Sequence, residues 1–241
     1  MLEGNRREIP VIYEDNHILI VEKPVNMPTQ ADESGDLDLL TALKEDLKLR
    51  HGKPGNVFLG LVHRLDRPVG GAMVFAKTSK AASRLSDTVR TRAFGKRYLA
   101  VVHGMMPQKK DTLHHYLLKD SRTNTVKAVP AKSHPDAKEA VLDYEVLQAA
   151  EGLSLVSVVL HTGRSHQIRV QMAESGCPLY GDQKYGSRVN KPGQQLALWS
   201  VWLSFEHPTL REPVSFSSRP PLEYPWSLWA EEHLTETGPA H

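Results

Sequence analysis

Short apolar runs separated by turn-forming residues recur along this chain, and they limit its possible folds more than any other feature. Runs of this length that are rich in β-branched and aromatic residues are typical of strands. We expect strands at 57–62, 72–76, 98–102, 113–118, 140–147, 153–160, 196–205 and 214–217, after two short strands that flank a turn at 15–16. Helical spacing of apolar residues predicts helices over 37–47, 79–93 and 165–176, with a last helical turn in 222–229. Many strands with few helices indicate an α+β domain with a mixed, mainly antiparallel sheet.

Candidate helix-capping residues indicate where two of the helices begin, and the lack of a linker indicates how the chain is divided into domains. Ser79 is placed to cap the second helix, and Ser165 is placed to open the third. No linker forces a domain boundary, so we expect one domain over 9–230, an extension over 1–8 and a flexible tail over 231–241. The stretch 123–136 is expected to be a surface excursion.

Several features of the sequence concern the compartment. The apolar runs are too short to span a membrane, and the N-terminal residues do not form a secretory signal. The single cysteine, Cys177, cannot form an internal disulfide, and this is typical of a reducing environment. We therefore expect a cytoplasmic protein without membrane association.

Positive charge is concentrated in one segment of a nearly neutral chain. The whole chain has 30 Lys and Arg against 28 Asp and Glu, a net charge of +2, whereas residues 77–97 hold seven Lys or Arg against one Asp. A local basic surface suits a polyanion such as nucleic acid, and it also suits an ordinary solvated helix face. If the partner is nucleic acid, the phosphate contacts are expected from Arg84, Arg90, Arg92 and Lys96.

Common chemical motifs are absent from the sequence. It contains no glycine-rich phosphate loop, no G-x-G-x-x-G, no H-E-x-x-H and no pair of cysteines. The twelve histidines do not form a zinc-binding pattern, because adjacent side chains on a strand, such as His114 and His115, point to opposite faces. We therefore expect no metal site.

The segment His63-Arg64-Leu65-Asp66-Arg67 places a carboxylate between two arginines, directly after a predicted strand. Two glycines follow at 70–71, where the backbone can turn tightly or a ligand can approach closely. Contact with the arginines would favour the ionised carboxylate, which suits a nucleophile or a base better than a general acid. The alternative is a structural Arg-Asp ion pair in a loop.

Two further stretches combine basic and aromatic residues. One surrounds a predicted helix start, at His161-Thr162-Gly163-Arg164-Ser165-His166-Gln167-Ile168-Arg169. The free N–H groups of that helix and Arg164 would form an anion site, and Arg169 would reach a carboxylate on another strand; solvated arginines are the alternative. The other stretch, Lys96-Arg97-Tyr98, puts an aromatic ring among cations at a strand start. There Tyr98 would stack on a base or simply fill a strand position.

Taken in order, these three stretches resemble the RluA-like family of RNA pseudouridine synthases. The resemblance extends from Tyr13-Glu14-Asp15-Asn16-His17-Ile18-Leu19-Ile20-Val21-Glu22-Lys23-Pro24 to Tyr180-Gly181-Asp182 and Tyr185-Gly186. It implies one α+β catalytic domain over 9–230, with a long mixed sheet flanked by helices and loops, and no S4-type RNA-binding module before it. It also implies isomerisation of uridine to pseudouridine within RNA, without a cofactor.

The resemblance implies roles for individual residues. Asp66 matches the essential catalytic aspartate of the family's H-R-L-D motif, and Arg64 matches an arginine that contacts RNA around the displaced nucleotide. Tyr98 matches the tyrosine that packs on the target base, and Arg169 matches the basic residue that pairs with the aspartate. These matches make Asp66, Tyr98 and Arg169 the expected catalytic residues.

RNA is the partner that the resemblance implies. We predict a monomer that acts on structured RNA, either tRNA or rRNA, after flipping the target nucleotide out of its stack. The residues expected to bind RNA are Arg64, Arg67, Arg84, Arg90, Arg92, Lys96, Arg164 and His166. The chain departs from the family pattern at Val69-Gly70, where Thr-Ser is usual, and at Asn26, where glycine is usual. Neither departure removes a proposed catalytic group.

Two other functions fit parts of the pattern. An RNA-binding module without catalysis would use the same fold and basic patches, and a change of Asp66 would leave it intact. A hydrolase would use Asp66 with His63 or His161 as base, although a second acid is then expected nearby. The sequence leaves open which uridine is modified, and whether the carboxylate adds to the ribose, adds to the base or removes a ribose proton.

Overall fold

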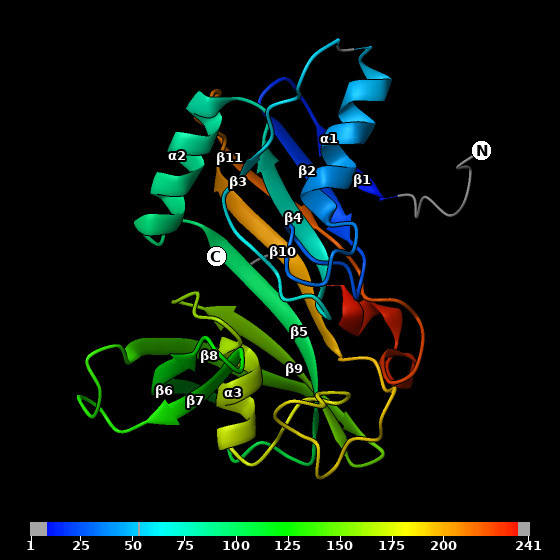
Figure 1. The fold of residues 1–241 in the computed structure, drawn as a ribbon. Helices are drawn as coiled ribbons and strands as arrows, with labels where there is room; N and C mark the ends of the chain where they lie inside the picture. The colour runs from blue at the N-terminus through cyan, green and yellow to red at the C-terminus, as the bar shows by residue number, and fades with distance from the viewer. Residues whose placement is uncertain (1–8, 53, 236–241) are drawn as a thin grey trace.

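The computed structural model describes residues 9–52 and 54–235, which form one large sheet with helices packed against it (Figure 1). Within the described residues the sheet has eleven strands, in the order β1-β2-β4-β10-β5-β9-β8-β6-β7, with β3 paired to β4 and β11 paired to β10. The strands are β1 Val11–Glu14, β2 Ile18–Lys23, β3 Gly60–Leu61, β4 Gly70–Ala76, β5 Gly95–His103, β6 Lys110–Asp120, β7 Thr125–Val129, β8 Lys138–Ala150, β9 Leu153–Leu160, β10 Leu198–Glu206 and β11 Pro213–Ser217. The expected extension over residues 1–8 lies outside the described residues.

One parallel contact interrupts an otherwise antiparallel sheet in the described chain. The β4–β10 pairing is parallel and joins Gly70 to Trp199 and Gly71 to Ser200; the other pairings are antiparallel. The prediction of an α+β fold with a mixed, mainly antiparallel sheet is therefore confirmed. In Figure 1, β5 and β10 run from the half of the molecule that contains β1–β4 into the half that contains β6–β9.

The described α-helices are α1 Leu39–Arg50, α2 Ser79–Arg90 and α3 Gln167–Glu174. Asp38 caps α1 by accepting a hydrogen bond from a first-turn N–H. The prediction that Ser79 caps α2 is wrong, because Thr78 is extended and its hydroxyl accepts the capping bond. Ser165 does not open α3 either. The helix begins after His166, which has a left-handed backbone with φ 53° and makes no side-chain cap bond.

Alternating side chains of the central strands fill separate cores on the two faces of the sheet, because successive strand residues point in opposite directions. On β2, Leu19 and Val21 belong to the core that includes α1 and α3, whereas Ile18 and Ile20 belong to the core that includes α2. A third cluster, built on β5 and β10, is closed by the 3₁₀ turns Trp226–Leu228 and Glu231–Leu234. No helix among the described residues is long and apolar enough to cross a membrane.

Three predictions about elements are corrected by the structure. The expected surface excursion over 123–136 contains β7, which pairs with β6 and buries Val126 in a small cluster with α3. The expected strand over 57–62 shrinks to Gly60–Leu61, because those two residues have a partner in β4. The tail expected to be flexible over 231–241 contains a 3₁₀ turn at Glu231–Leu234, where Leu234 is buried in the third cluster, and its residues 236–241 lie outside the described residues.

Candidate active site

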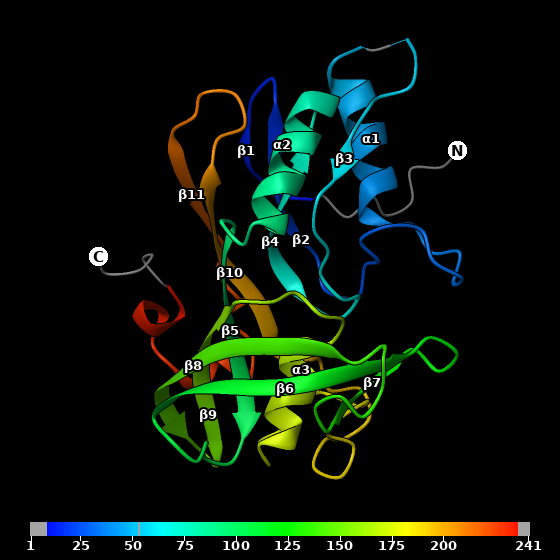
Figure 2. The same cartoon turned by 90° about the vertical axis from the view of Figure 1, so that its left-hand side faces the viewer.

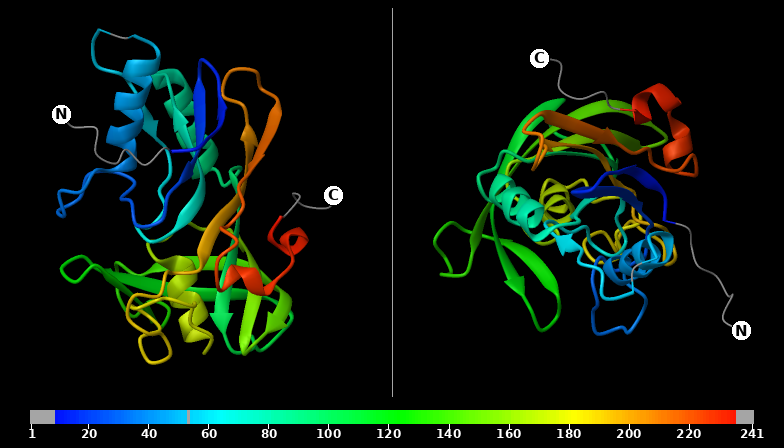
Figure 3. Two further views of the ribbon diagram at one scale, coloured as in Figure 1. Left: turned by 90° about the vertical axis from the view of Figure 1, so that its right-hand side faces the viewer. Right: turned by 90° about the horizontal axis from the view of Figure 1, so that it is seen from above.

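A cleft of about 1720 Å³ lies between the two halves of the sheet. Its walls come from residues of the segments 61–69, 89–98, 159–169 and 181–198, with smaller contributions from 26–32 and from β6 and β8. Figure 2 shows the half with α1 and α2 and the half with β6, β8 and α3 that supply these segments, and Figure 3 shows the same halves from the opposite side. Nine lining residues are Lys or Arg and three are Asp or Glu, so the cleft is far more basic than the chain as a whole.

The loop that carries Asp66 is held by contacts to its backbone. Leu65 and Val69 are buried on either side of Asp66, and the hydroxyl of Thr29 donates a hydrogen bond to the Leu65 carbonyl. The Lys23 ammonium donates to the carbonyls of residues 24, 67 and 69, at 2.8–3.0 Å. Burial lowers the pKa of Lys23 to about 7, although the nearby Asp66 charge opposes this shift. These contacts leave the Asp66 side chain 29% exposed at the cleft.

Arg169 reaches Asp66 from α3, as the sequence predicts. Its Nη1 atom lies 3.4 Å from Asp66 Oδ2, although the two residues are 103 positions apart in the chain. The same guanidinium makes two shorter hydrogen bonds of 2.8 Å to the two oxygens of Asp182. Burial alone would raise the pKa of Asp182, but the bonds from Arg169 and from two backbone N–H groups lower it overall. Asp182 therefore holds Arg169, and Arg169 presents its remaining nitrogen to Asp66.

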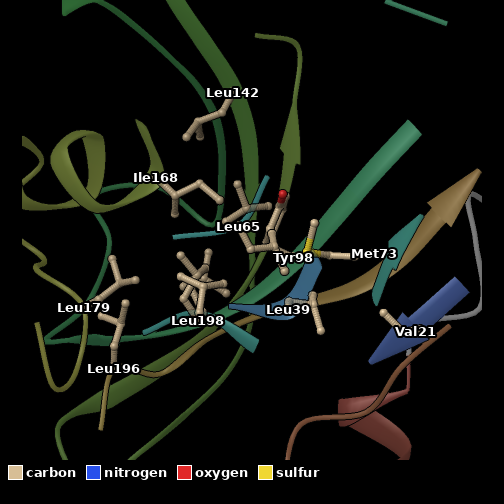
Figure 4. Packing of buried hydrophobic residues seen from close by; sticks show 14 of the residues in the cluster. Val21, Leu39, Leu65, Met73, Tyr98, Leu142, Ile168, Leu179, Leu196 and Leu198 are labelled. Carbon is tan, nitrogen blue, oxygen red and sulfur yellow. The ribbon is translucent and has the colours of Figure 1, made fainter. Parts of the chain in front are cut away.

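Tyr98 lies on β5 at the floor of the cleft. It belongs to the first core together with Leu65, Met73 and Leu198, and Figure 4 shows these side chains gathered around its ring. Its residue is only 5% exposed, yet it lines the cleft on the same side as Asp66. Burial raises the pKa of the Tyr98 phenol, and the nearby Asp66 charge raises it further, so the group stays neutral. The ring is thus a fixed, neutral surface in the lining of the cleft.

His63 and His161 do not have the geometry of a base for Asp66. The His63 Nε2 atom accepts a hydrogen bond from the backbone N–H of Val74 at 3.0 Å. Burial, together with the charge of Lys96, lowers the pKa of His63 to about 3, so the ring is a neutral structural acceptor. His161 pairs through Nε2 with Asp143 at 2.6 Å. Both histidines that the hydrolase alternative requires are therefore engaged elsewhere.

Most of the residues predicted to bind RNA line the cleft, and three have surroundings that the sequence did not indicate. The predicted cations that line the cleft are Arg64, Arg67, Arg90, Arg92, Lys96 and Arg164. Arg67 does not flank Asp66 as expected, because its guanidinium pairs with Asp32 at 3.6 Å and with Asp36 at 2.7 Å. Arg84 faces a separate small hollow and donates to the Pro208 carbonyl. His166 lies beside Asp66, with its Nε2 atom 3.8 Å from Oδ2.

Three residues without a predicted role hold the predicted site in place: Lys23 binds the backbone of the Asp66 loop, and Asp182 and Tyr185 contact the Arg169 guanidinium. Lys23 and Asp182 belong to the family-like segments at the two ends of the resemblance, but no role was predicted for them. Tyr185, from the same C-terminal segment, lies with its ring 5.2 Å from the Arg169 guanidinium carbon. Among the described residues, no group of three or more His, Cys, Asp or Glu side chains is close enough to hold a metal ion.

The fold and the cleft define the class of the protein. The structure superposes on the human protein RNA Pseudouridylate Synthase Domain Containing 4, with a TM-score of 0.74 at 23% identity, over 88% of each chain. It also superposes on the human protein RNA Pseudouridylate Synthase Domain Containing 1, with a TM-score of 0.73 at 26% identity, over 92% of this chain and 88% of that chain. The fold is that of a pseudouridine synthase.

Sequence comparisons identify the family. The RNA pseudouridylate synthase family matches residues 17–174. YhcT, an RNA pseudouridine synthase of Bacillus subtilis, is 35% identical over 86% of this chain and 67% of its own length. Ribosomal large subunit pseudouridine synthase D of Haemophilus influenzae is 31% identical over 92% of this chain and 70% of its own length. The chain belongs to the RluA-like family of RNA pseudouridine synthases, which are intramolecular isomerases.

Proposed function

We propose that this protein converts specific uridines of rRNA or tRNA to pseudouridine and that Asp66 is its catalytic carboxylate. The observation that carries the proposal is the position of Asp66. The carboxylate is partly exposed in a basic cleft, 3.4 Å from a buried arginine, and the ring of Tyr98 lines the same cleft. We include ribosomal RNA among the proposed substrates because two relatives are named ribosomal large subunit pseudouridine synthases.

The reaction needs few kinds of chemical group. The N1–C1′ bond of uridine breaks, the base turns, and a C5–C1′ bond forms, while the hydrogen at C5 is lost to water. Substrate and product are isomers, so the reaction consumes no co-substrate. A carboxylate oxygen can attack the ribose, attack the base or take a ribose proton, and all three routes require the same oxygen beside an everted nucleoside. In this proposal Arg169 orients the Asp66 carboxylate by its charge.

The cleft also provides what base flipping requires. Removing a nucleotide from its stack costs a few kcal/mol, and stacking on an aromatic side chain returns about 1–3 kcal/mol per base. Tyr98 is an aromatic residue of the cleft lining, near enough for the Asp66 charge to raise its pKa. Arg64, Arg90 and Arg92 would hold the phosphates on either side of the flipped nucleotide. We propose that one chain suffices and that it works in the cytoplasm.

Tritium release tests the proposal directly. The substrate is total RNA labelled with tritium at uridine C5 and isolated from cells that lack this gene, so that the natural target sites are unmodified. We expect wild-type protein to release tritium without added metal or cofactor, and we expect Asp66→Asn to release none while still binding RNA. Lys80→Met, on the exposed face of α2, is the matched control and should behave as wild type.

Two outcomes would overturn the assignment. Release that persists in Asp66→Asn would show that another group is the catalyst. RNA cleavage, detected as shorter fragments on a gel, would favour the hydrolase. Sites of modification in rRNA or tRNA are then found by comparing pseudouridine maps of cells with and without the gene, and a map without differences would rule out both RNA classes.

A further inference from the structure

A histidine and a tyrosine that the proposed chemistry does not use lie behind Asp66. The His166 side chain is 9% exposed, and its ring contacts the ring of Tyr185 edge to face, with centroids 5.7 Å apart. Tyr185 also packs against Arg169, whose guanidinium carbon lies 5.2 Å from the ring centroid. One tyrosine therefore supports both of the nitrogen-bearing side chains that approach Oδ2 of Asp66.

The hydroxyl of Tyr185 determines which nitrogen of His166 carries the proton. The backbone N–H of Val126, on β7, donates to this hydroxyl at 2.9 Å, and His166 Nδ1 lies 2.6 Å from it. The N–H of Val126 can only donate, so it occupies a lone pair of the phenol oxygen. Among the described residues, His166 Nδ1 is the acceptor within reach of the phenol proton. If Nδ1 donated instead, the phenol proton would have no partner among the described residues, so the arrangement favours donation from the hydroxyl to Nδ1.

The other nitrogen of the ring then faces the carboxylate with a proton. In a neutral imidazole one nitrogen accepts and the other donates, so an accepting Nδ1 requires the proton on Nε2. His166 Nε2 lies 3.8 Å from Asp66 Oδ2, and Arg169 Nη1 lies 3.4 Å from the same oxygen. The Arg169 contact is a long hydrogen bond and the His166 separation is beyond hydrogen-bond distance, but catalytic contacts of this kind in free enzymes commonly shorten in the substrate complex.

The surroundings of His166 keep the ring neutral. Burial lowers the pKa of His166, and the charges of Arg169 and Lys184 lower it further. Asp66 and Asp182 act in the opposite direction without reversing the shift. The remaining titratable group in contact with the ring is Tyr185, whose pKa is raised by burial, so it keeps its proton as well.

The backbone of His166 is also unusual. It lies in the left-handed region, with φ 53° and ψ 20°, immediately before α3. Residues other than glycine enter this region when surrounding contacts hold them there. Here the conformation turns the ring inward to Tyr185 and Asp66 instead of outward to solvent.

We propose that His166 is a positioning residue for Asp66: in the substrate complex its ring, oriented by the Tyr185 hydroxyl, donates from Nε2 to one carboxylate oxygen and leaves the other free to react. The inference rests on the proposed role of Asp66. It replaces the direct contact with RNA that the sequence predicts for His166. It also gives β7 a part in the active site, since Val126 anchors the hydroxyl.

Kinetics of four variants test the proposal with the tritiated RNA described above. Loss of a residue that orients a reactive group typically costs about 10–100-fold in activity, and we expect His166→Ala to lose this much kcat with little change in KM. His166→Gln, whose amide nitrogen reaches the position of Nε2, should recover most of the rate. His166→Asn, whose shorter amide reaches only the position of Nδ1, should not. Tyr185→Phe should lower kcat in the same direction as His166→Ala.

Two kinetic results would overturn the proposal. A His166→Ala variant that raises KM and leaves kcat unchanged would make His166 an RNA contact. Equal rates for the Gln, Asn and Ala variants would show that no donor is needed at this position. Circular dichroism verifies that each variant is folded before its rate is compared.

Nitrogen NMR of the wild-type protein gives a second test that requires no variant. Histidine labelled with ¹⁵N on the ring should show, for His166 at pH 7, an unprotonated Nδ1 and a protonated Nε2. A proton on Nδ1, or a doubly protonated ring, would overturn the proposal. The proposed function fails separately: it falls if Asp66→Asn is active, whereas an inactive Asp66→Asn beside a fully active His166→Ala would remove this inference alone.

Discussion

Arg169 has two carboxylate partners, and the contacts differ in strength. It binds buried Asp182 through two hydrogen bonds of 2.8 Å, and it approaches Asp66 at 3.4 Å from a third nitrogen. A bidentate pair of this kind fixes the plane of the guanidinium. The position of the charge beside Asp66 is therefore set by Asp182, a residue that faces the arginine from the loop before β10.

Replacement of Arg169 should consequently impair both folding and turnover. Arg169→Met leaves the Asp182 charge buried without its partner, and breaking a buried pair in this way costs about 3–5 kcal/mol of unfolding free energy. Arg169→Met/Asp182→Asn should regain much of that stability but not the rate, because Asp66 still lacks its cation. Urea unfolding and tritium release measure the two effects. A double variant with near-normal turnover would show that Arg169 acts only as a structural residue.

At the scale of elements, the start of β4 explains why residue 70 is glycine where the family usually has serine. Gly70 is buried where β4 meets β10, and a Cβ atom at this position would overlap the ring of Trp199. At Gly71 a Cβ atom would overlap the Ser200 backbone, and φ is 111°. The large indole thus occupies the space that a side chain at residue 70 needs. Val69-Gly70 and Trp199 are matched parts of the strand junction that ends the Asp66 loop.

A double-mutant cycle tests this match. Overpacking a filled core typically costs about 1–3 kcal/mol, and we expect Gly70→Ser to lose at least this much unfolding free energy in urea. Gly70→Ser/Trp199→Leu should lose less than the two single changes added together, because the smaller side chain leaves room for the serine. Exact additivity of the single changes would show that the indole does not exclude a side chain at residue 70.

At the scale of the molecule, the lining of the cleft is much more positively charged than the net charge of the chain indicates. Nine cations and three carboxylates line a cleft in a chain whose net charge is +2. Association with RNA through such a surface releases counterions, so the affinity falls as salt rises. Arg90 and Arg92 lie at the cleft wall, whereas Arg84, six residues before Arg90 on α2, donates to the Pro208 carbonyl beside the other hollow.

Salt dependence of RNA binding should separate these arginines. Each phosphate contact contributes about 0.7 to the slope of log affinity against log salt for single-stranded RNA, so Arg90→Ala/Arg92→Asn should reduce the slope by about 1.4. Asparagine is chosen for Arg92 because its φ of 63° is left-handed. Arg84→Ala is the matched change outside the cleft and should leave the slope unaltered. Filter binding at several salt concentrations measures all three slopes; equal reductions would contradict the assignment of RNA to this cleft.

Local patterns in the sequence predict much of this structure. Apolar alternation identified most of the strands, because half-buried strands need one apolar face. It missed β7, whose five residues bury little more than Val126. The catalytic candidates Asp66, Tyr98 and Arg169 came from short motifs, and the fold brings all three to one cleft.

The partners of those residues depend on tertiary structure. Arg67 is the chain neighbour of Asp66 and yet pairs with Asp36, while Arg169 reaches Asp66 across 103 residues. Likewise, the proton position on His166 follows from a tyrosine of one loop and a backbone N–H of β7. Local periodicity reflects steric preference and burial, which each segment carries in its own residues. A hydrogen-bond partner depends on the path of the whole chain, and only the packed sheet determines it.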